Sequence, residues 1–320
     1  MHLNIYEFMP KTKVLKINKQ NPEPDKIRYA AEIIKQGGLV VFPTETVYGL
    51  GASVFNIDAV KNIFKAKGRP ADNPLIVHIA DIKDVQSLTK KPPKIAMPLM
   101  ERFWPGPLTI VLKKKKSVSD IVTAGSDSVA VRMPDNKIAL CLIREAGVPL
   151  AAPSANISGK PSPTRASDVL EDLNGRVDLI IDGGAAKIGI ESTVIDITNK
   201  PPTILRPGGI TREDIESLIG KVDLIVFDVS YQGISSLTVD SSSHLKSPGL
   251  KYKHYAPNAE VVIVEGSTEN VQKKIKALAA EVLKNNKKVG VISFRKNAMY
   301  KDCIVVFAGA DANAAAKRLF

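Results

Sequence analysis

The sequence predicts an α/β protein in which helices pack on a twisted, mixed sheet, followed by a small Rossmann-like α/β domain. Short apolar runs alternate with segments of helical periodicity along the 320 residues. The alternation stops in a serine-rich stretch and resumes near the C-terminus. A hydrophobic content of 44% and a charged content of 24% are typical of globular proteins.

The first part of the chain supplies most of the expected elements. Apolar runs bounded by glycine, proline or polar residues predict strands at Leu39–Phe42, Leu75–Ile79, Leu108–Leu112, Val129–Met133, Pro149–Ala152, Leu179–Asp182, Val194–Ile197 and Thr203–Leu205. Apolar residues at three- and four-residue spacing predict helices at Asp25–Gln36, Asp58–Lys65, Lys94–Phe103, Lys137–Glu145, Arg165–Leu173 and Arg212–Leu218.

The pattern divides the chain into residues 1–226 as the main domain, 227–258 as a linker and 259–320 as the small domain. In the small domain we expect strands at Glu260–Val264, Lys288–Ser293 and Cys303–Ala308, and helices at Glu269–Asn285 and Asp311–Phe320. No G-x-G-x-x-G opens the first of these helices, so the dinucleotide fingerprint is absent. Three strands form a thin sheet with a small core, which leaves open whether this domain is truncated, degenerate or partly disordered.

Composition narrows the function classes. No apolar run reaches the length of about 18 residues that a membrane span needs, and the N-terminus lacks the apolar core of a signal peptide. Cys141 and Cys303 are far apart, which argues against a disulfide framework or a zinc site and predicts a cytoplasmic protein. The net charge of +12 predicts a polyanionic partner, either RNA or a nucleotide triphosphate. The Lys113–Lys116 run is interpreted as a solvated strand end.

Polar residues follow several of the expected strands. Leu39–Phe42 leads into Thr44, Glu45, Thr46 and Tyr48, and the glycines that follow are expected to allow tight turns or a close approach of a ligand. Polar groups at the carboxyl ends of strands are how α/β proteins build binding sites.

Four further clusters carry polar or charged residues: the first lies in the loop after the expected helix Asp58–Lys65, and the second again follows an apolar strand. They contain Lys67 with Arg69, Ser154 with Asn156, Glu191 with Ser192, and Arg206 before Pro-Gly. The sequence shows no Ser-His-Asp arrangement, HExxH motif or P-loop, and it has only four histidines. Cations and hydroxyls suit anionic substrates and preorganised electrostatic stabilisation.

Together these segments resemble the YrdC family, and more closely its longer members, the threonylcarbamoyl-AMP synthases. The family's K-x-R and S-x-N motifs correspond to Lys67-Gly-Arg69 and Ser154-Ala-Asn156. The resemblance also covers PTETVYGLG, NPLIVH, EST and LRPG, and it extends to the segment 247–257, which is similar to the family's interdomain linker.

The resemblance implies a reaction in which L-threonine, bicarbonate and ATP yield threonylcarbamoyl-adenylate and diphosphate, with Mg²⁺ on the phosphates. It implies a downstream tRNA threonylcarbamoyl transferase complex as the partner, a weak contact with tRNA, and no membrane. Lys67 and Arg69 are the expected catalytic residues, because they offset the charge of a carboxylate that approaches a triphosphate.

The resemblance also assigns binding residues. The expected L-threonine pocket comprises Thr46, His78, Arg132, Ala152 and Ser192, with Arg132 as the guanidinium fork for the carboxylate. The expected ATP contacts are Arg69, Asn73, Ser128, Ser154, Asn156, Ser162, Arg206 and Lys251. No residue is assigned to a metal.

Two alternatives remain open. One is a non-catalytic RNA-binding module, because the expected fold is basic and concave. The other is the carbamoyl-adenylate chemistry of hydrogenase-maturation proteins, whose acylphosphatase-like module and cysteine-rich zinc motifs are not visible in this sequence.

Overall fold

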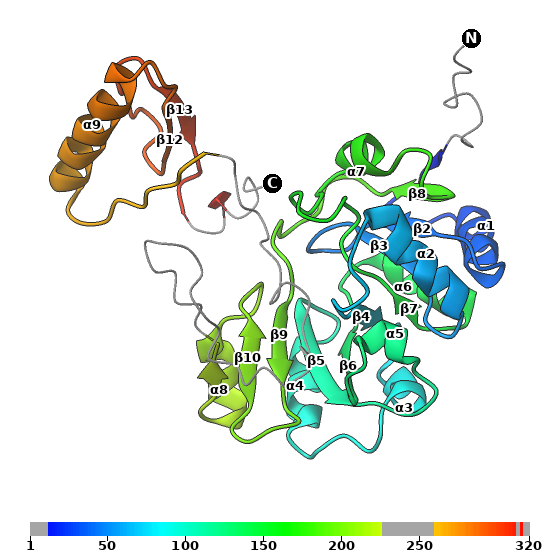
Figure 1. The fold of residues 1–320 in the computed structure, drawn as a ribbon. Coiled ribbons are helices and arrows are strands. Elements are labelled where there is room, and N and C mark those ends of the chain that lie inside the picture. Colours follow the sequence, from blue (N-terminus) through cyan, green and yellow to red (C-terminus); the bar gives the residue numbers. More distant parts are fainter. Residues whose placement is uncertain (1–11, 226–258, 312–313, 316–320) are drawn as a thin grey trace, which may run out of the picture. The chain divides into compact units, whose positions relative to one another are not determined.

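The structure is a computed structural model that describes residues 12–225, 259–311 and 314–315. The chain forms two compact units, Met1–His254 and Tyr255–Phe320. The first unit is a mixed α/β fold in which helices flank a large twisted sheet (Figure 1), which confirms the predicted fold class. None of the described helices is long and apolar enough to cross a membrane.

Among the described residues, eleven strands form the main sheet, in the order β1-β8-β2-β3-β7-β4-β6-β5-β9-β10-β11. Their bounds are β1 Lys13–Lys16, β2 Val40–Phe42, β3 Gly49–Ser53, β4 Ile76–His78, β5 Leu108–Lys113, β6 Ser128–Arg132, β7 Leu150–Ala151, β8 Leu179–Asp182, β9 Thr193–Asp196, β10 Thr203–Arg206 and β11 Asp223–Leu224. The sheet is mixed, since β4 and β6 pair in parallel whereas β5 and β6 pair antiparallel.

The helices of this unit are α1 Pro24–Lys35, α2 Ile57–Lys67, the 3₁₀ turn η2 Ile82–Asp84, α3 Val85–Leu88, α4 Ala96–Phe103, α5 Asp120–Thr123, α6 Lys137–Ala146, α7 Ala166–Leu173 and α8 Arg212–Ile219. Helix α2 illustrates how capping residues determine where a helix begins and ends. The Asn56 side chain accepts a hydrogen bond from the Ala59 amide at its start, and Gly68 ends it with a φ of 59°. Gly68 therefore turns the chain so that Arg69 leaves the helix axis.

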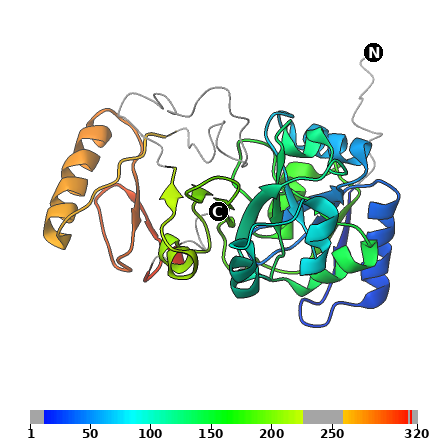
Figure 2. The ribbon, with the colours of Figure 1, turned by 90° about the horizontal axis from the view of Figure 1, so that it is seen from below.

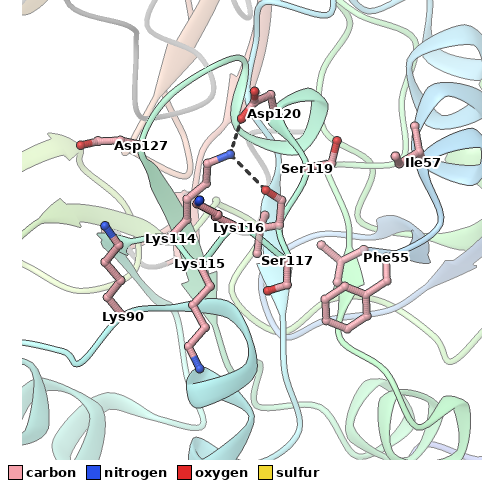
Figure 3. Close-up of a pocket in the computed structure, with 12 residues that line it drawn as sticks. Phe55, Ile57, Lys90, Lys114, Lys115, Lys116, Ser117, Ser119, Asp120 and Asp127 are labelled. Carbon is pink, nitrogen blue, oxygen red and sulfur yellow. Dashed lines mark hydrogen bonds and ion pairs between the residues drawn. The ribbon is translucent and has the colours of Figure 1, made fainter.

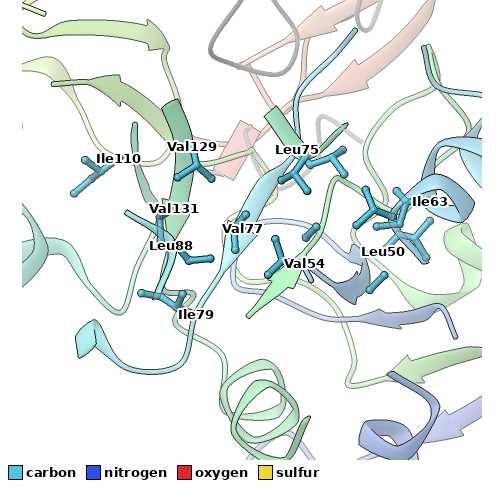
Figure 4. Packing of buried hydrophobic residues seen from close by; sticks show 14 of the residues in the cluster. Leu50, Val54, Ile63, Leu75, Val77, Ile79, Leu88, Ile110, Val129 and Val131 are labelled. Carbon is cyan, nitrogen blue, oxygen red and sulfur yellow. The ribbon is translucent and has the colours of Figure 1, made fainter. Parts of the chain in front are cut away.

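Side-chain alternation along the strands separates two faces of the sheet. Val77 and Val131 belong to the large core cluster on one face, and Figure 4 shows them among other buried aliphatic side chains. The next residue on each strand, His78 or Arg132, points to the opposite face because successive strand side chains alternate. That opposite face is covered by α1 and α6 over the β2–β8 half of the sheet. Figure 2 shows the same unit from below.

The structure corrects one interpretation of the PTETVYGLG segment. Gly49 and Gly51 do not form a turn but belong to strand β3, which pairs antiparallel with β2. A Cβ atom on Gly51 would lie 2.6 Å from the Phe42 ring, so the absent side chain makes room for that ring. The prediction of tight turns at these glycines was therefore wrong. Strands β1 and β11 and the short helices α3 and α5 were not predicted.

The second unit contains α9 Thr268–Lys284 and a parallel pair of strands, β12 Gly290–Ser293 and β13 Ile304–Phe307. The strand expected at Glu260–Val264 is absent from the structure, and Val261 and Ile263 are exposed there. Of the expected helix Asp311–Phe320, Ala314 and Ala315 are helical and most of the other residues lie outside the described residues. The expected linker 227–258, including Lys251, also lies outside them.

Candidate active site

Strand register brings the first candidate residues together. His78 and Arg132 are register partners at the carboxyl ends of the parallel strands β4 and β6. The β5–β6 register pairs Ile110 with Val131, which places Thr109 beside Arg132. All three side chains lie on the sheet face opposite the large core cluster, so this face carries a polar cluster at one end of the strands.

Arg132 is the centre of this polar cluster. Its Nη1 donates to Thr46 Oγ1 at 3.0 Å and its Nε donates to the Gly106 carbonyl at 3.3 Å. Its Nη2 lies 2.7 Å from Glu45 Oε1, and both side chains are almost fully buried. Three protein oxygens from two separate segments therefore surround the guanidinium group.

The cluster also contains unsatisfied polar atoms. Although Arg132 Nη2 and Glu45 Oε1 are within ion-pair distance, their angles do not form a hydrogen bond. Among the described buried side chains, Arg132 Nη2, both Glu45 carboxylate oxygens and His78 Nδ1 have no hydrogen-bond partner. Unsatisfied buried groups are costly, and they concentrate at functional sites.

His78 is a neutral imidazole in this setting. Its ring meets Phe42 edge to face, with centroids 6.1 Å apart. Burial, followed by the nearby charge of Arg132, lowers the pKa of His78 to about 3. The side chain can therefore donate or accept a hydrogen bond near neutral pH, but it does not add positive charge.

Ser192 and Arg206 extend the cluster across β9 and β10. Ser192 Oγ lies 2.7 Å from Thr109 Oγ1, which is completely buried. Arg206 donates to the Ser192 carbonyl from Nε at 3.2 Å and from Nη2 at 3.0 Å. Burial lowers the pKa of Arg206, Glu191 acts against this lowering, and Arg132 adds to it. Two arginines and two hydroxyls are thus held near each other.

Lys67 and the S-x-N segment form a second buried group. The Lys67 ammonium donates to the backbone carbonyls of Ser154 and Asn156. Ser154 Oγ donates to Asn156 Oδ1 at 2.6 Å. Burial, followed by the charge of Arg69, lowers the pKa of Lys67. The structure therefore brings the K-x-R and S-x-N motifs into direct contact.

Arg69 is also anchored by backbone oxygens. Its Nε donates to the Asn73 carbonyl at 3.2 Å and its Nη2 to the Pro74 carbonyl at 2.9 Å. Ser162, from a third segment, donates to Glu191 Oε1 at 2.6 Å.

The segment 43–49 connects these groups. The Glu45 carbonyl accepts from the amides of Lys187 and Ile188, and the Tyr48 carbonyl accepts from the Ala155 amide. The Arg132 cluster and the Lys67 cluster are therefore joined by one stretch of backbone. Two predicted residues are less directly involved. Ala152 contributes its amide to the Ile76 carbonyl, and Ser128, at the far end of β6 from Arg132, contacts Ser126 Oγ at 2.8 Å.

Two residues of the cluster were not predicted as site residues. Glu45 was recognised only as a polar residue, because nothing local shows that it meets an arginine 87 positions away. Thr109 is a lone hydroxyl inside an apolar strand, and this interruption was its only signal.

A hollow of about 640 Å³ lies elsewhere, lined by Lys90, Lys114, Lys115, Lys116, Phe55 and neighbouring residues. In Figure 3 the amines of Lys90 and Lys115 point in different directions, and Lys114 contacts Asp120 and the Val118 carbonyl. The lysines do not converge on one point, so this hollow is not the candidate active site.

Comparisons with known proteins agree with this geometry. Residues 32–208 match the Sua5_yciO_yrdC family, described as "Telomere recombination". Residues 210–320 match the family described as "Threonylcarbamoyl-AMP synthase, C-terminal domain". The chain is 53% identical over 274 residues to threonylcarbamoyl-AMP synthase of Pyrococcus abyssi, which covers 86% of this chain and 78% of that protein. It is 50% identical over 274 residues to the Bacillus subtilis synthase, with 85% and 75% covered.

Solved structures also show similarity to Sua5 and YciO proteins. The P. abyssi Sua5 complex with L-threonine superimposes with a TM-score of 0.87 and 49% identity, covering 97% of this chain and 87% of that one. Escherichia coli YciO superimposes with a TM-score of 0.59 and 26% identity, covering 64% of this chain and 99% of that one.

Proposed function

Because the chain belongs to the Sua5–YciO–YrdC family, we propose that it is an L-threonylcarbamoyladenylate synthase. It condenses L-threonine, bicarbonate and ATP to threonylcarbamoyl-AMP and diphosphate, for formation of threonylcarbamoyladenosine in tRNA. By reaction type it is a nucleotidyltransferase. The RNA-binding alternative is not favoured, because the similar curated proteins are named as synthases.

The buried Arg132 cluster is the observation that carries this proposal. A guanidinium group surrounded by oxygens of Glu45, Thr46 and Gly106 suits the planar carboxylate of an amino acid. Thr46, neutral His78 and Ser192 supply hydrogen-bonding groups for the substrate hydroxyl and amine. We assign Thr46, His78, Arg132, Ala152 and Ser192 to the L-threonine pocket, as the resemblance to the family implies.

The phosphate side follows from the second buried cluster. The threonine amine and bicarbonate form a carbamate with loss of water, and the carbamate is already an anion, so no serine or cysteine has to be activated. Its carboxylate attacks the α-phosphorus of ATP, a P–O bond forms, and diphosphate leaves with the electron pair of the broken P–O bond. Anchored cations reduce the repulsion between these anions. Lys67 and Arg69 were expected in that role; we keep Arg69 and add Arg206, and we withdraw Lys67 because its ammonium group donates to the carbonyls of Ser154 and Asn156.

Other predicted ATP contacts remain proposals. Asn73, Ser128, Ser154, Asn156 and Ser162 lie on the segments that surround Lys67 and Arg69 or continue from them. Lys251 lies outside the described residues.

We propose that Mg²⁺ binds to the phosphates of ATP, and we assign no protein residue as its ligand. Among the described residues, no group of three or more histidine, cysteine, aspartate or glutamate side chains is arranged to hold a metal ion. The described side chains therefore do not fit a metal site held by the protein, and no step of the proposed reaction depends on such a site. We also propose a cytoplasmic location and delivery of the product to a tRNA threonylcarbamoyl transferase complex.

Diphosphate release with single-component omissions tests the proposed function. The complete mixture of ATP, Mg²⁺, L-threonine and bicarbonate should release diphosphate, and omission of either L-threonine or bicarbonate should reduce release to background. Equal release without L-threonine would refute the assignment. An Arg132→Lys variant serves as a site-specific control, because it retains the charge but loses the planar fork.

A further inference from the structure

The loop Ser154–Lys160, which carries the S-x-N motif, is held on two sides by charged side chains from different helices. Lys67, the last residue of α2, contacts its first half. Asp172, on α7, contacts its second half. The two helices are far apart in sequence, so this arrangement is not visible in either motif alone.

Lys67 directs its ammonium group entirely at this loop. Its acceptors are the carbonyls of Ser154 and Asn156 and, at 3.4 Å, Asn156 Oδ1. An ammonium group has three N–H donors and no acceptor, so these three oxygens match its whole donor capacity. The side chain is only 1% exposed. In this arrangement no N–H group of Lys67 is left to contact a phosphate.

The backbone reinforces this contact. The amide of Ser158 donates to the Lys67 carbonyl at 2.9 Å, so the same residue binds the loop through its main chain and its side chain. Within the loop, the Asn156 amide group donates to the carbonyls of Ile157 and Lys160 at 2.8 and 2.7 Å. A displacement of Lys67 would therefore be transmitted to both Ser154 and Asn156.

Asp172 holds the opposite side of the loop. Its Oδ2 accepts from the Ile157 amide at 3.1 Å and its Oδ1 pairs with Lys160 Nζ at 2.6 Å. Its carboxylate is 11% exposed, whereas the Lys160 side chain is 56% exposed. The amide contact is therefore better protected from solvent than the ion pair, and it ties the loop backbone to α7.

The two charges also act on each other. Burial and the nearby Arg69 lower the pKa of Lys67, and Asp172 acts against this lowering. The loop thus lies between a buried cation and a largely buried anion that stabilise each other.

We propose that Lys67 and Asp172 are positioning residues that together hold the Ser154–Lys160 loop, and that neither touches ATP. Ser154, which is only partly buried, is then the residue that the loop presents to the nucleotide, whereas both amide hydrogens of Asn156 are bound inside the loop. This inference rests on the proposed function for the identity of the ligand. The contacts of Lys67 and Asp172 with the loop are observed in the structure and do not depend on that function.

The test combines kinetics with amide hydrogen exchange on the full chain. Lys67→Met removes the ammonium group and keeps a long side chain. Asp172→Asn keeps the shape and removes the charge. Glu171→Gln is the matched control, because Glu171 is the exposed neighbour of Asp172 on the same helix and takes part in none of the hydrogen bonds or ion pairs described for the loop Ser154–Lys160.

We expect Asp172→Asn to lower kcat about 5- to 10-fold and Lys67→Met about 10- to 150-fold, since both lose charge-assisted contacts. KM for L-threonine should stay within about twofold of the wild-type value, because the Arg132 cluster is intact in both variants. Amide exchange should become faster at residues 155–160. The double variant should be less impaired than the product of the single effects, because both act through one loop.

Two results would overturn the proposal. One is Asp172→Asn behaving like Glu171→Gln in both kcat and loop exchange. The other is Lys67→Met weakening ATP binding with unchanged loop exchange, which would make Lys67 a direct phosphate contact. If Lys67→Met does not fold, Asp172→Asn and Lys67→Arg give the same comparison. If wild-type protein shows no threonine-dependent diphosphate release, the proposed function fails. The amide exchange data would still test whether Lys67 and Asp172 hold the loop.

Discussion

Replacing Glu45 with alanine should destabilise the main unit by about 3–5 kcal/mol, because it leaves the Arg132 guanidinium buried without its counter-charge. The side chains of Arg132 and Glu45 are 4% and 3% exposed, and the closest nitrogen and oxygen atoms are 2.7 Å apart. At an effective dielectric constant of about 20, the Coulomb attraction over that distance is about 6 kcal/mol, before the cost of desolvation is subtracted. The remaining contacts of Arg132 to Thr46 and Gly106 are to neutral oxygens and do not replace the lost charge.

The chain offers a matched control for this perturbation. Glu32 forms an ion pair with Lys35 at 2.8 Å, but these side chains are 51% and 41% exposed. Glu32→Ala should therefore cost no more than about 1 kcal/mol. Trp104, the single tryptophan, is buried in the main unit, so its fluorescence during urea unfolding reports on that unit for both variants. Equal losses of stability for Glu45→Ala and Glu32→Ala would refute the view that the Arg132–Glu45 pair is a buried charge pair.

Three further predictions concern other parts of the site. The folded-state pKa of His78 is about 3 and the unfolded value is about 6.5, so the unfolded state binds this proton first as the pH falls. Stability should fall by up to about 1.4 kcal/mol per pH unit from about pH 6.5 down to about pH 3, and urea unfolding of His78→Gln should lack this contribution. A Cβ on Gly208 would lie 2.4 Å from the Glu191 carbonyl oxygen, so Gly208→Ala should lower the midpoint of thermal unfolding, whereas Gly290→Ala, with open space at its Cβ position, should not. Diphosphate release should be faster with L-threonine than with L-serine and slowest with L-valine, because L-serine lacks only the methyl group, whereas L-valine lacks the hydroxyl and leaves polar groups of the pocket without a partner; equal rates for threonine and valine would contradict the pocket.

Local patterns in the sequence predicted most of the main unit. Apolar runs such as Leu108–Leu112 and capped periodic segments such as α2 appear in the structure close to their expected bounds. Strand β3 was missed because Gly49 and Gly51 favour a turn in isolation, whereas here they make room for Phe42. The expected strand at Glu260–Val264 was wrong: these residues pair with no described strand, and an apolar run becomes a strand only when it pairs with a neighbour.

Prediction of the site had a similar limit. The resemblance to the YrdC family supplied Arg132, Ser192 and the K-x-R and S-x-N residues, which the structure brings together. Glu45, Thr109 and Asp172 were not assigned, because their partners lie 87, 83 and 15 residues away and only the folded sheet and loops bring them into contact. In the charge run Lys113–Lys116, which was interpreted as solvated, Lys113, Lys115 and Lys116 are exposed, whereas the Lys114 side chain is only 12% exposed and pairs with Asp120.

Isotope tracing tests the central claim most directly. Purified protein would be incubated with ATP, Mg²⁺, L-threonine and ¹³C-bicarbonate, and the nucleotide products analysed at once by mass spectrometry. The account predicts an adenylate that carries both the threonine and one ¹³C atom, formed together with diphosphate, and its loss when Arg132 is replaced by lysine. ATP turnover that yields no adenylate containing threonine and ¹³C would contradict the account.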